Sequence, residues 1–361
     1  MSPSHGVVRL GALSLAALLC GCATVGCKPD QPGPGEPNAE LVCDGDYLPA
    51  LLDLVANAES RVLVTQFELF SGTSTSQVVT ALGDAVDRGV TVKVLLDDEI
   101  ESNAGAAQSL INRGVDAKTD LFPDTTVHSK MLIADGDDAL VGSTNWSTSS
   151  ISRNHECNLR LSNGAPVAWL EAWFDNVWAN ASERVLPPAQ DTDGARVIAL
   201  ADDLLLPSLL ESINGARQRV DFTLYGTFLQ PNNLSSPAMQ VYGALADAAD
   251  RGVTVRGVAE WSDWQFDNNE RNEAAVEWLE ERGVDMRWET VEVITHAKAF
   301  LIDDTAQIQS ANISTSGFER NREVGAWTDL SLPVQALEEW FDARWAESTD
   351  EAVARRGGGR R

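Results

Sequence analysis

Hydrophobic residues along the chain switch between two spacings, and the switching predicts an α/β protein. Leu and Val at helical spacing predict helices over residues 47–58, 76–88, 106–113 and 167–179. Short, nearly continuous apolar runs predict strands over residues 61–70, 90–96, 128–134, 139–143 and 154–161. Strands that alternate with helices in this way indicate a mixed β-sheet flanked by helices.

The order of these elements repeats after a linker at residues 186–195. Asp87 to Val92 recurs letter for letter as Asp250 to Val255, and the other matches keep an offset between 158 and 169 residues. A repeat of that length indicates a duplicated domain and not a short-period solenoid. We therefore expect two α/β domains, at residues 44–185 and 196–350, related by a pseudo-twofold axis with equivalent sites meeting between them.

One polar pattern, H-x-K-x4-D, occurs once in each half and is followed each time by Ser-x-Asn. The first copy is His128, Lys130 and Asp135 with Ser143 and Asn145. The second copy consists of His296, Lys298 and Asp303 with Ser310 and Asn312. The chain has only four His and five Lys, so an ordinary pair of strands does not account for two of each in matching frames.

These residue types suit chemistry at phosphorus. Residues two apart on a strand face the same side, so the His and Lys of each motif project together. Lys and Asn can hold phosphate oxygens, and a His whose far nitrogen is held by a carboxylate can attack phosphorus while a second His protonates the leaving oxygen. Glu156 and Glu323 follow the two motifs at similar spacing. The lysines supply positive charge, so we expect neither a metal nor another cofactor.

The doubled motif resembles that of the phospholipase D superfamily, over residues 45–350. The resemblance implies two phospholipase D-like domains with His128 as the nucleophile, which forms a phosphohistidine, and His296 as the general acid. It also implies that the lysines act in catalysis, that Glu156 and Glu323 orient the imidazoles, and that the Ser-x-Asn residues bind substrate. Asp135 and Asp303 are expected to hold strand ends. The second copy has Gln309 in place of Gly142 and a turn one residue shorter, which leaves the placement of Asn312 open.

The N-terminus predicts export and a lipid anchor. A short apolar run at residues 10–19 follows Arg9, and Leu19-Cys20-Gly21-Cys22 is typical of a bacterial lipoprotein signal at residues 1–22, with Cys22 lipidated. Cys27 is a second candidate, and the alternative is a plain secretory signal or an uncleaved anchor. Residues 23–43 predict a Pro/Gly-rich tether, and residues 351–361 a basic, disordered tail. We expect a lipoprotein at the periplasmic face of the outer membrane or elsewhere in the cell envelope, or a secreted protein.

The other cysteines add little. If the chain is exported, Cys27 and Cys43 could pair, which would leave Cys157 as a small buried hydrophobe. The sequence contains no C-x-x-C and no His/Cys cluster that suggests a metal site.

The net charge of −27 disfavours nucleic acid as a partner, because proteins that bind phosphate backbones usually carry a basic surface. The leading expectation is a monomer that hydrolyses phospholipid at a membrane surface to phosphatidic acid and the free head group. The alternatives are a phosphatidyltransferase similar to cardiolipin synthases, a metal-independent endonuclease and a non-catalytic binding protein. Cardiolipin synthases of this family usually carry N-terminal membrane spans, and no such span is expected beyond the leader, so hydrolysis is favoured over transfer.

Overall fold

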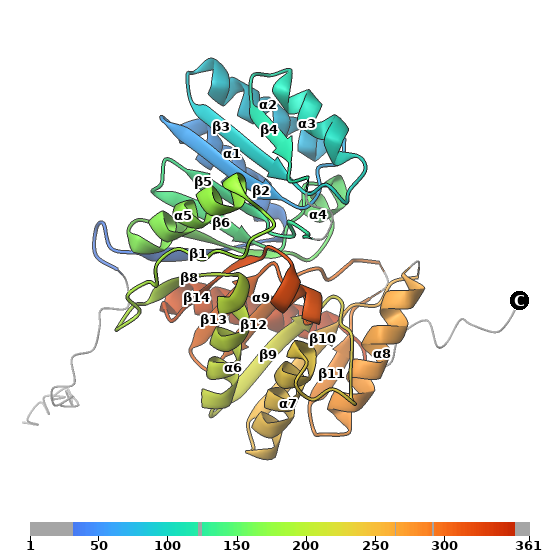
Figure 1. Cartoon of the computed structure of the whole chain (residues 1–361). Helices are drawn as coiled ribbons and strands as arrows, with labels where there is room; N and C mark the ends of the chain where they lie inside the picture. The colour runs from blue at the N-terminus through green and yellow to red at the C-terminus, as the bar shows by residue number, and fades with distance from the viewer. Residues whose placement is uncertain (1–31, 122–124, 264, 291, 351–361) are drawn as a thin grey trace, which may run out of the picture. The chain divides into compact units, whose positions relative to one another are not determined.

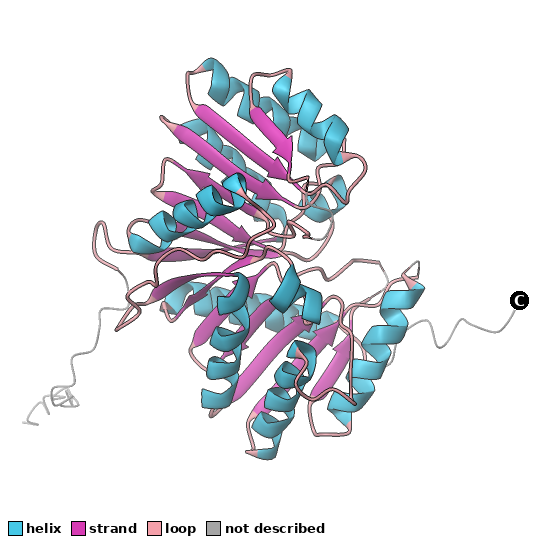
Figure 2. Cartoon of the chain, viewed as in Figure 1, coloured by secondary structure: helices cyan, strands magenta, loops and turns pink. Residues whose placement is uncertain are grey.

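The computed structural model describes residues 32–121, 125–263, 265–290 and 292–350, and its two halves repeat one architecture (Figure 1). Within these residues each half builds a mixed seven-stranded sheet with helices packed against it (Figure 2). None of the described helices is both long and apolar enough to span a bilayer. The predicted duplicated α/β architecture is confirmed.

The first half runs through seven strands and five α-helices in the described residues. They are β1 (Asn38–Cys43), α1 (Tyr47–Asn57), β2 (Arg61–Gln66), α2 (Thr73–Asp87), β3 (Thr91–Leu96), α3 (Asn103–Ile111), β4 (Asp116–Thr119), β5 (Met131–Ala134), β6 (Asp138–Gly142), α4 (Thr148–Ser152), β7 (Cys157–Ser162) and α5 (Ala165–Ala179). A single helical turn, η1, covers Asp44–Asp46.

The second half follows the same course after a connection without regular structure. Its elements are β8 (Val197–Ala201), α6 (Leu205–Gly215), β9 (Arg219–Leu224), α7 (Pro237–Asp250), β10 (Thr254–Ala259), α8 (Phe266–Glu280), β11 (Asp285–Trp288), β12 (Ala299–Ile302), β13 (Thr305–Gln309), β14 (Val324–Thr328) and α9 (Ser331–Glu347). Short helical turns, η2 (Asp202–Leu204) and η3 (Ser316–Arg320), complete it.

The two sheets have the same strand order once the repeat is taken into account. The first is β1-β7-β6-β5-β2-β3-β4 and the second is β8-β14-β13-β12-β9-β10-β11. In each, three strands are parallel and the other four pair antiparallel. The carboxyl ends of the parallel strands β2, β3, β9 and β10 therefore deliver their loops to one edge of each sheet, where binding sites of open α/β sheets form.

Three apolar clusters hold these layers together. One joins α1, α2 and α3 to the first sheet, and a second joins α6, α7 and α8 to the second sheet. The third unites the halves, because α5 and α9 bury Trp173, Phe174 and Leu337 together with residues of both sheets such as Ala199 and Leu159. Burial at about 25 cal/mol per Å² of apolar area makes this shared cluster a main source of cohesion between the halves.

The predicted helices and strands are present, but several strands are shorter than the apolar runs suggested. The run at residues 61–70 pairs only to Gln66, the strand expected from His128 begins at Met131, and the strand expected from Asn154 begins at Cys157. The residues ahead of these last two strands leave the sheet to bridge across to the other half, where Val127 lies beside Arg322. Local apolar patterns carry no information about such long-range pairing.

The folded part begins earlier than expected. The tether was predicted to reach Cys43, but Asn38–Cys43 form β1, the edge strand that pairs antiparallel with β7. The stretch was assigned to the tether because of the Pro and Gly residues before it, whereas its own alternation Ala39, Leu41, Cys43 fits a strand. The predicted signal peptide, Cys22 and the basic tail at residues 351–361 lie outside the described residues.

The cysteine predictions are wrong in the described part of the chain. Cys43 and Cys157, which face each other across β1 and β7, form a disulfide with a Cα–Cα distance of 4.3 Å. Cys43 is therefore not available to Cys27, and Cys157 is not a lone thiol. The sequence does not reveal this disulfide, because Cys43 faces Cys157 only when Asn38–Cys43 pairs with β7 as an edge strand.

Candidate active site

The two motif histidines each bind a carboxylate of the other half. Nδ1 of His128 lies 2.9 Å from Oε1 of Glu323, and Nδ1 of His296 lies 2.9 Å from Oε1 of Glu156. Both glutamates are fully buried and both histidines are nearly so. The sequence placed one His and one Glu in each half, and the structure pairs them crosswise, so neither half holds a complete pair.

The direction of these hydrogen bonds fixes the imidazole tautomer. An ionised carboxylate only accepts, so Nδ1 of each histidine carries the proton and donates it, which leaves Nε2 with a free lone pair. Burial lowers the pKa of His128 and lowers that of His296 to about 4, which keeps both imidazoles neutral near pH 7. Burial acts to raise the pKa values of Glu156 and Glu323, but the histidine, the motif lysine and the serine hydroxyl near each carboxyl together lower its pKa and keep it ionised.

The two carboxylates are themselves held by the Ser residues of the Ser-x-Asn segments. Ser143 donates to Glu156 at 2.6 Å, and Ser310 donates to Glu323 at 2.5 Å. Glu156 receives a further hydroxyl donor from Ser150. Ser143 and Ser310 are expected from the sequence to bind substrate, but in the structure their hydroxyl groups donate to Glu156 and Glu323.

Each motif lysine folds back beside its own histidine. Nζ of Lys130 donates to the carbonyl of His128, and Nζ of Lys298 donates to the carbonyl of His296. Burial lowers the pKa of Lys130 to about 8 and lowers that of Lys298 well below its usual range. The charge of Lys298 lowers the pKa of His128, and the charge of Lys130 lowers the pKa of Lys298. The two lysines and the two histidines therefore lie in one electrostatic environment. An anion entering it would favour the charged lysines.

An aromatic ring packs against each His–Lys pair, a feature that the sequence analysis missed. Phe67 meets His128 edge to face with centroids 4.8 Å apart, and Nζ of Lys130 lies 5.0 Å from its ring centre. Tyr225 meets His296 in the same way at 4.4 Å, with Nζ of Lys298 4.7 Å from its ring centre. These rings follow β2 and β9 directly, and they hold the imidazole planes while shielding them from water.

The motif asparagines keep unused hydrogen-bonding capacity at the same site. The side-chain carbonyl oxygens of Asn145 and Asn312 are buried and have no hydrogen-bond partner among the described residues. Buried polar groups are usually paired in the folded protein. An unpaired side-chain carbonyl oxygen can accept a hydrogen bond from a hydroxyl group of a bound ligand, and the NH₂ group of the same asparagine can donate to a phosphate oxygen.

Comparison with known proteins now decides the family. The family described as "Cardiolipin synthase, PLD-like domain" matches the chain twice, at residues 51–178 and 209–345. The chain belongs to the phospholipase D superfamily. The phospholipases D of Rickettsia typhi and Rickettsia prowazekii are 35% and 36% identical to it over 115 and 129 residues, which are 30% and 34% of this chain. The chain spans only 54% and 59% of the length of those two relatives.

A solved structure extends the likeness in fold. The phosphatidylserine synthase of Haemophilus influenzae superposes with a TM-score of 0.64 and 12% identity, and the match covers 88% of each chain. At that identity the likeness concerns the fold. It shows that the fold of most of this chain recurs in another solved protein.

The motif aspartates lie at the far ends of the strands that the histidines precede. Asp135 accepts hydrogen bonds from the backbone N–H groups of residues 59, 60 and 61, and Asp303 accepts them from residues 217, 218 and 219. Burial acts to raise the pKa of Asp135, but these donors lower it to about 2. Both aspartates take a positive φ, 58° and 46°. They fix the turn after β5 or β12 to the start of β2 or β9.

The departure at Gln309 is compensated within the sheet. Gly142 lies opposite Asn158 in the first half, and Gln309 lies opposite Gly325 in the second. A Cβ at Gly142 would lie 2.4 Å from the carbonyl of Cys157, and one at Gly325 would lie 2.6 Å from the carbonyl of Ile308. The small and the large residue have exchanged strands, so Ser310 keeps the position that Ser143 has in the first half.

A second aspartate in each half supports the glutamate strand, and it too was missed from the sequence. Asp44 accepts the N–H of Glu156 at 2.9 Å and that of the Trp340 indole at 2.9 Å. Asp202 likewise accepts the N–H of Glu323 and the indole N–H of Trp173, each at 3.0 Å. A signal existed, because Asp44 and Pro49 recur as Asp202 and Pro207 at one offset of 158 residues.

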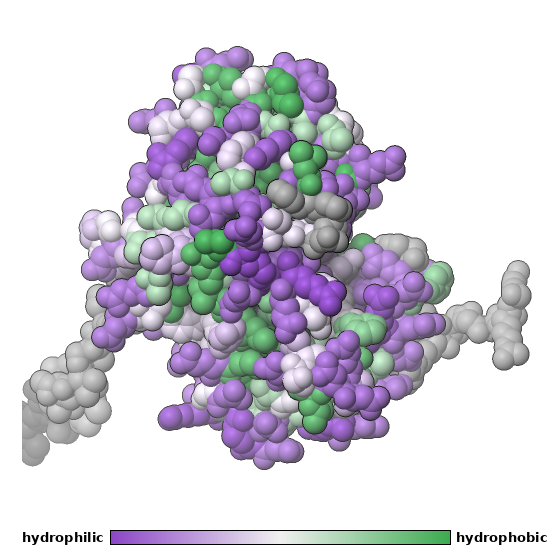
Figure 3. Space-filling view, in the orientation of Figure 1, coloured by the Kyte–Doolittle hydropathy of each residue, from purple (hydrophilic) through white to green (hydrophobic). Residues whose placement is uncertain are grey.

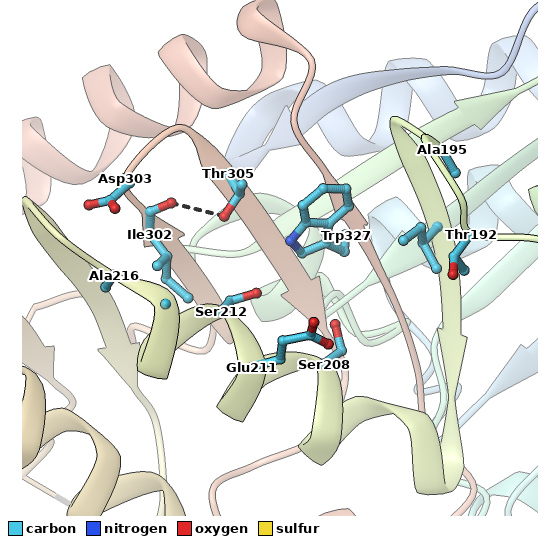
Figure 4. Close-up of a pocket in the computed structure, with 12 residues that line it drawn as sticks. Thr192, Ala195, Ser208, Glu211, Ser212, Ala216, Ile302, Asp303, Thr305 and Trp327 are labelled. Atoms are coloured by element: carbon cyan, nitrogen blue, oxygen red, sulfur yellow. Dashed lines mark hydrogen bonds between the residues drawn. The ribbon is translucent and has the colours of Figure 1, made fainter.

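A separate cavity of about 420 Å³ lies beside α6 (Figure 4). Figure 4 shows Ser208, Glu211 and Ser212 on the helix, facing the side chains of Thr305 and Trp327. Asp303 reaches its rim, but none of the motif His, Lys or Asn residues lines it. The cavity is therefore distinct from the site built by the paired histidines.

Proposed function

We propose that the chain is a phosphodiesterase that hydrolyses phospholipid to phosphatidic acid and the free head group. The observation that carries the proposal is the crossed pair of imidazoles, each with Nδ1 on a buried carboxylate and each beside a buried lysine. Two neutral imidazoles with free Nε2 atoms and two potential cations suit an in-line transfer of a phosphoryl group through the protein itself.

In the first step Nε2 of His128 attacks phosphorus while the bond from phosphorus to the head-group oxygen breaks. That oxygen takes a proton from Nε2 of His296. The anionic substrate raises the pKa of this imidazole, which takes up that proton from solvent when the substrate binds. Glu323 stabilises the positive charge that His128 gains as it becomes a phosphohistidine. The choice of His128 as the nucleophile follows the superfamily resemblance.

In the second step water replaces the head group. Nε2 of His296 removes a proton from the water as it attacks phosphorus, and the bond from phosphorus to Nε2 of His128 breaks. Phosphatidic acid leaves and both imidazoles return to their starting state. Lys130, Lys298, Asn145 and Asn312 hold the phosphate oxygens throughout, where they offset the charge of the transition state.

The surface supports a lipid over a nucleic acid as the substrate. Two of the described lysines belong to the site, and the other two, Lys93 and Lys118, lie over the ring of Trp178. Hydrophilic side chains cover most of the face drawn in Figure 3, between separate apolar patches. Large apolar side chains are exposed between the parallel strands and the elements that follow them, on loops at Phe70, Leu121, Phe228 and Leu234 and at the first residue of α8, Phe266. Apolar loops beside the site suit a lipid interface, and the predicted anchor at Cys22 would hold the protein there.

The test is product analysis by mass spectrometry on vesicles of phosphatidylcholine and phosphatidylglycerol, with the wild type, His128→Asn and His296→Asn. We expect phosphatidic acid from the wild type and a loss of at least about 10⁴-fold in both variants. Diphosphatidyl product in place of phosphatidic acid would assign the chain to phosphatidyl transfer. Metal-independent cleavage of DNA without lipid turnover, abolished by His128→Asn, would assign it to the nucleases.

A further inference from the structure

The peptide unit between Thr126 and Val127, just ahead of His128, has hydrogen bonds at both its carbonyl and its N–H. Its carbonyl, on Thr126, accepts the backbone N–H of Arg322 at 2.8 Å. Its N–H, on Val127, donates to Oδ2 of Asp97 at 2.6 Å. Asp97 comes directly after β3, so a carboxylate at the end of a parallel strand grips the chain just before the histidine.

The second half repeats this grip with different residues. The carbonyl of Ile294 accepts the backbone N–H of His155 at 2.8 Å. The N–H of Thr295 donates to Oε2 of Glu260 at 2.7 Å, and Glu260 comes directly after β10. The residue after Thr295 is His296.

In the opposite half, the residue whose N–H donates to each of these peptide carbonyls directly precedes a glutamate that binds an imidazole. Arg322 precedes Glu323, and His155 precedes Glu156. One peptide unit therefore connects the backbone of each histidine to the backbone of the glutamate that binds it. An N–H that donates to a side-chain carboxyl oxygen polarises its peptide, which strengthens the bond that the carbonyl of the same peptide accepts.

We propose that Asp97 and Glu260 are positioning residues for His128 and His296, acting through the peptide unit that each carboxylate holds. The proposal rests on the proposed phosphoryl transfer at the same site. It assigns a role to two side chains that lie outside the motifs and that touch neither imidazole nor lysine by a hydrogen bond.

A packing role does not account for an acid at these two positions. Asp97 and Glu260 are fully buried, and a second buried acid, Asp120 or Glu289, comes directly after the next parallel strand, β4 or β11. Burial raises the pKa of Asp97 to about 6 and that of Glu260 to about 8. A buried acid beside another acid costs free energy that an apolar side chain of similar size would not. Both halves nevertheless place an acceptor where the same peptide N–H points.

The experiment compares Glu260→Met with Glu260→Gln in the full-length protein. Met fills the space without an acceptor, whereas Gln keeps a carbonyl oxygen for the N–H of Thr295. We expect Met to lower kcat on bis(p-nitrophenyl) phosphate by roughly 10²-fold with little change in KM. Gln should keep kcat within about threefold of the wild type, because it retains the hydrogen bond.

Imidazole NMR supplies a readout that does not need turnover. The chain has four histidines, so the Nδ1–H resonance of His296 can be assigned by substitution. We expect Met to shift or broaden that resonance and Gln to leave it near its wild-type position. If the wild type turns over no phosphodiester, the proposed function fails, and this resonance still decides the positioning role.

Thr328→Val is the control for the loss of buried side-chain hydrogen bonding outside the site. Oγ1 of Thr328 donates to the carbonyl of Arg196 at 2.9 Å and accepts the N–H of Leu330 at 3.1 Å, and its side chain is buried at the end of β14. We expect this variant to lose stability but to keep kcat and the His296 resonance. Equal effects of Glu260→Met and Thr328→Val on both readouts would overturn the proposal. If Glu260→Met does not fold, the pair Asp97→Leu and Asp97→Asn decides it in the same way at His128.

Discussion

The two halves of the chain agree in what they present to the site and differ in how they support it. Each half supplies a His, a Lys, an Asn and a Glu, and each Glu serves the other half. The supports differ between β1–β7, which carries the disulfide Cys43–Cys157, and β8–β14, which pairs Ala201 with Val324 at the same place. The requirement of the chemistry is therefore the position of a few polar atoms, which different packing solutions can satisfy.

The crossing of the His–Glu pairs also explains why the halves share one apolar core. A half on its own would lack the imidazole that pairs with its carboxylate. The shared cluster around α5 and α9 holds the halves together, so that both pairs form. Duplication here produces one site and not two.

The largest effect should come from breaking the crossed pairs one at a time. Glu323→Gln and Glu156→Gln each remove the charge that supports one imidazole, and both should lower lipid turnover by about 10³- to 10⁴-fold. A substrate with an activated leaving group distinguishes the effects of these two variants. A p-nitrophenolate needs no general acid, so Glu156→Gln should keep a burst of product, whereas Glu323→Gln should lose it because His128 is the nucleophile.

Stopped-flow absorbance of p-nitrophenolate measures that burst, and intact-protein mass spectrometry locates the adduct. Ser182→Ala is a suitable control, because its hydroxyl donates to the side chain of Asn180 on an exposed segment. A burst that survives in Glu323→Gln and disappears in Glu156→Gln would reverse the assignment of nucleophile and acid.

The next effect concerns the disulfide. The double variant Cys43→Ala, Cys157→Val gives the first half the Ala and Val that the second half has at Ala201 and Val324. The disulfide closes a separation of 114 residues, so its loss should lower the free energy of unfolding by roughly 3 kcal/mol. Asp44 follows Cys43 and accepts the backbone N–H of Glu156, so loss of the disulfide should also lower lipid turnover. Reductant should bring the wild type to the same denaturation midpoint and leave the variant unchanged; a wild type indifferent to reductant would show that the pairing adds no stability.

A smaller effect is the change of the unfolding free energy with pH that the buried acid Glu260 should cause. Burial raises the pKa of Glu260 from 4.5 to about 8. The folded state therefore holds this proton more tightly than the unfolded state, and stability is lost as pH rises from about 4.5 to about 8. Glu260→Gln has no proton to lose there. The difference in unfolding free energy between Glu260→Gln and the wild type should grow in favour of Gln across that window, by at most about 1.4 kcal/mol per pH unit. Urea titrations at several pH values measure it, and a flat difference would contradict the raised pKa.

The sequence carried the fold because the repeat and the apolar spacing are local or periodic signals. His128, Lys130, His296 and Lys298 were found since they recur in one short frame, and the structure brings them together. The crossing of Glu156 and Glu323 had no signal, because spacing along the chain does not say which half a side chain faces. The rings of Phe67 and Tyr225 were missed for the same reason, whereas Asp44 and Asp202 did carry a signal, because they recur at an offset of 158 residues.

Two local errors have a common physical origin. Asn38–Cys43 was assigned to a tether because its strand character depends on β7, which lies more than a hundred residues away along the chain. The expected strand at His128 was too long because Val127 pairs with Arg322 in place of the sheet. In both cases the partner across the molecule decides the backbone, and a window of ten residues does not contain it.

The smallest effect should come from making the two aromatic contacts alike. Tyr225 differs from Phe67 by a hydroxyl, which lies 3.4 Å from Oε1 of Gln265 and is therefore weakly bonded. The ring itself contacts His296 and Lys298, and Tyr225→Phe keeps that contact. Turnover should change by less than about threefold, consistent with the loss of one weak hydrogen bond. Tyr225→Leu removes the ring and should cost roughly tenfold, because the imidazole loses its edge-to-face contact. If Tyr225→Phe were as damaging as Tyr225→Leu in steady-state assays, the hydroxyl would act in the reaction, and the two halves would differ in their chemistry as well as in their support.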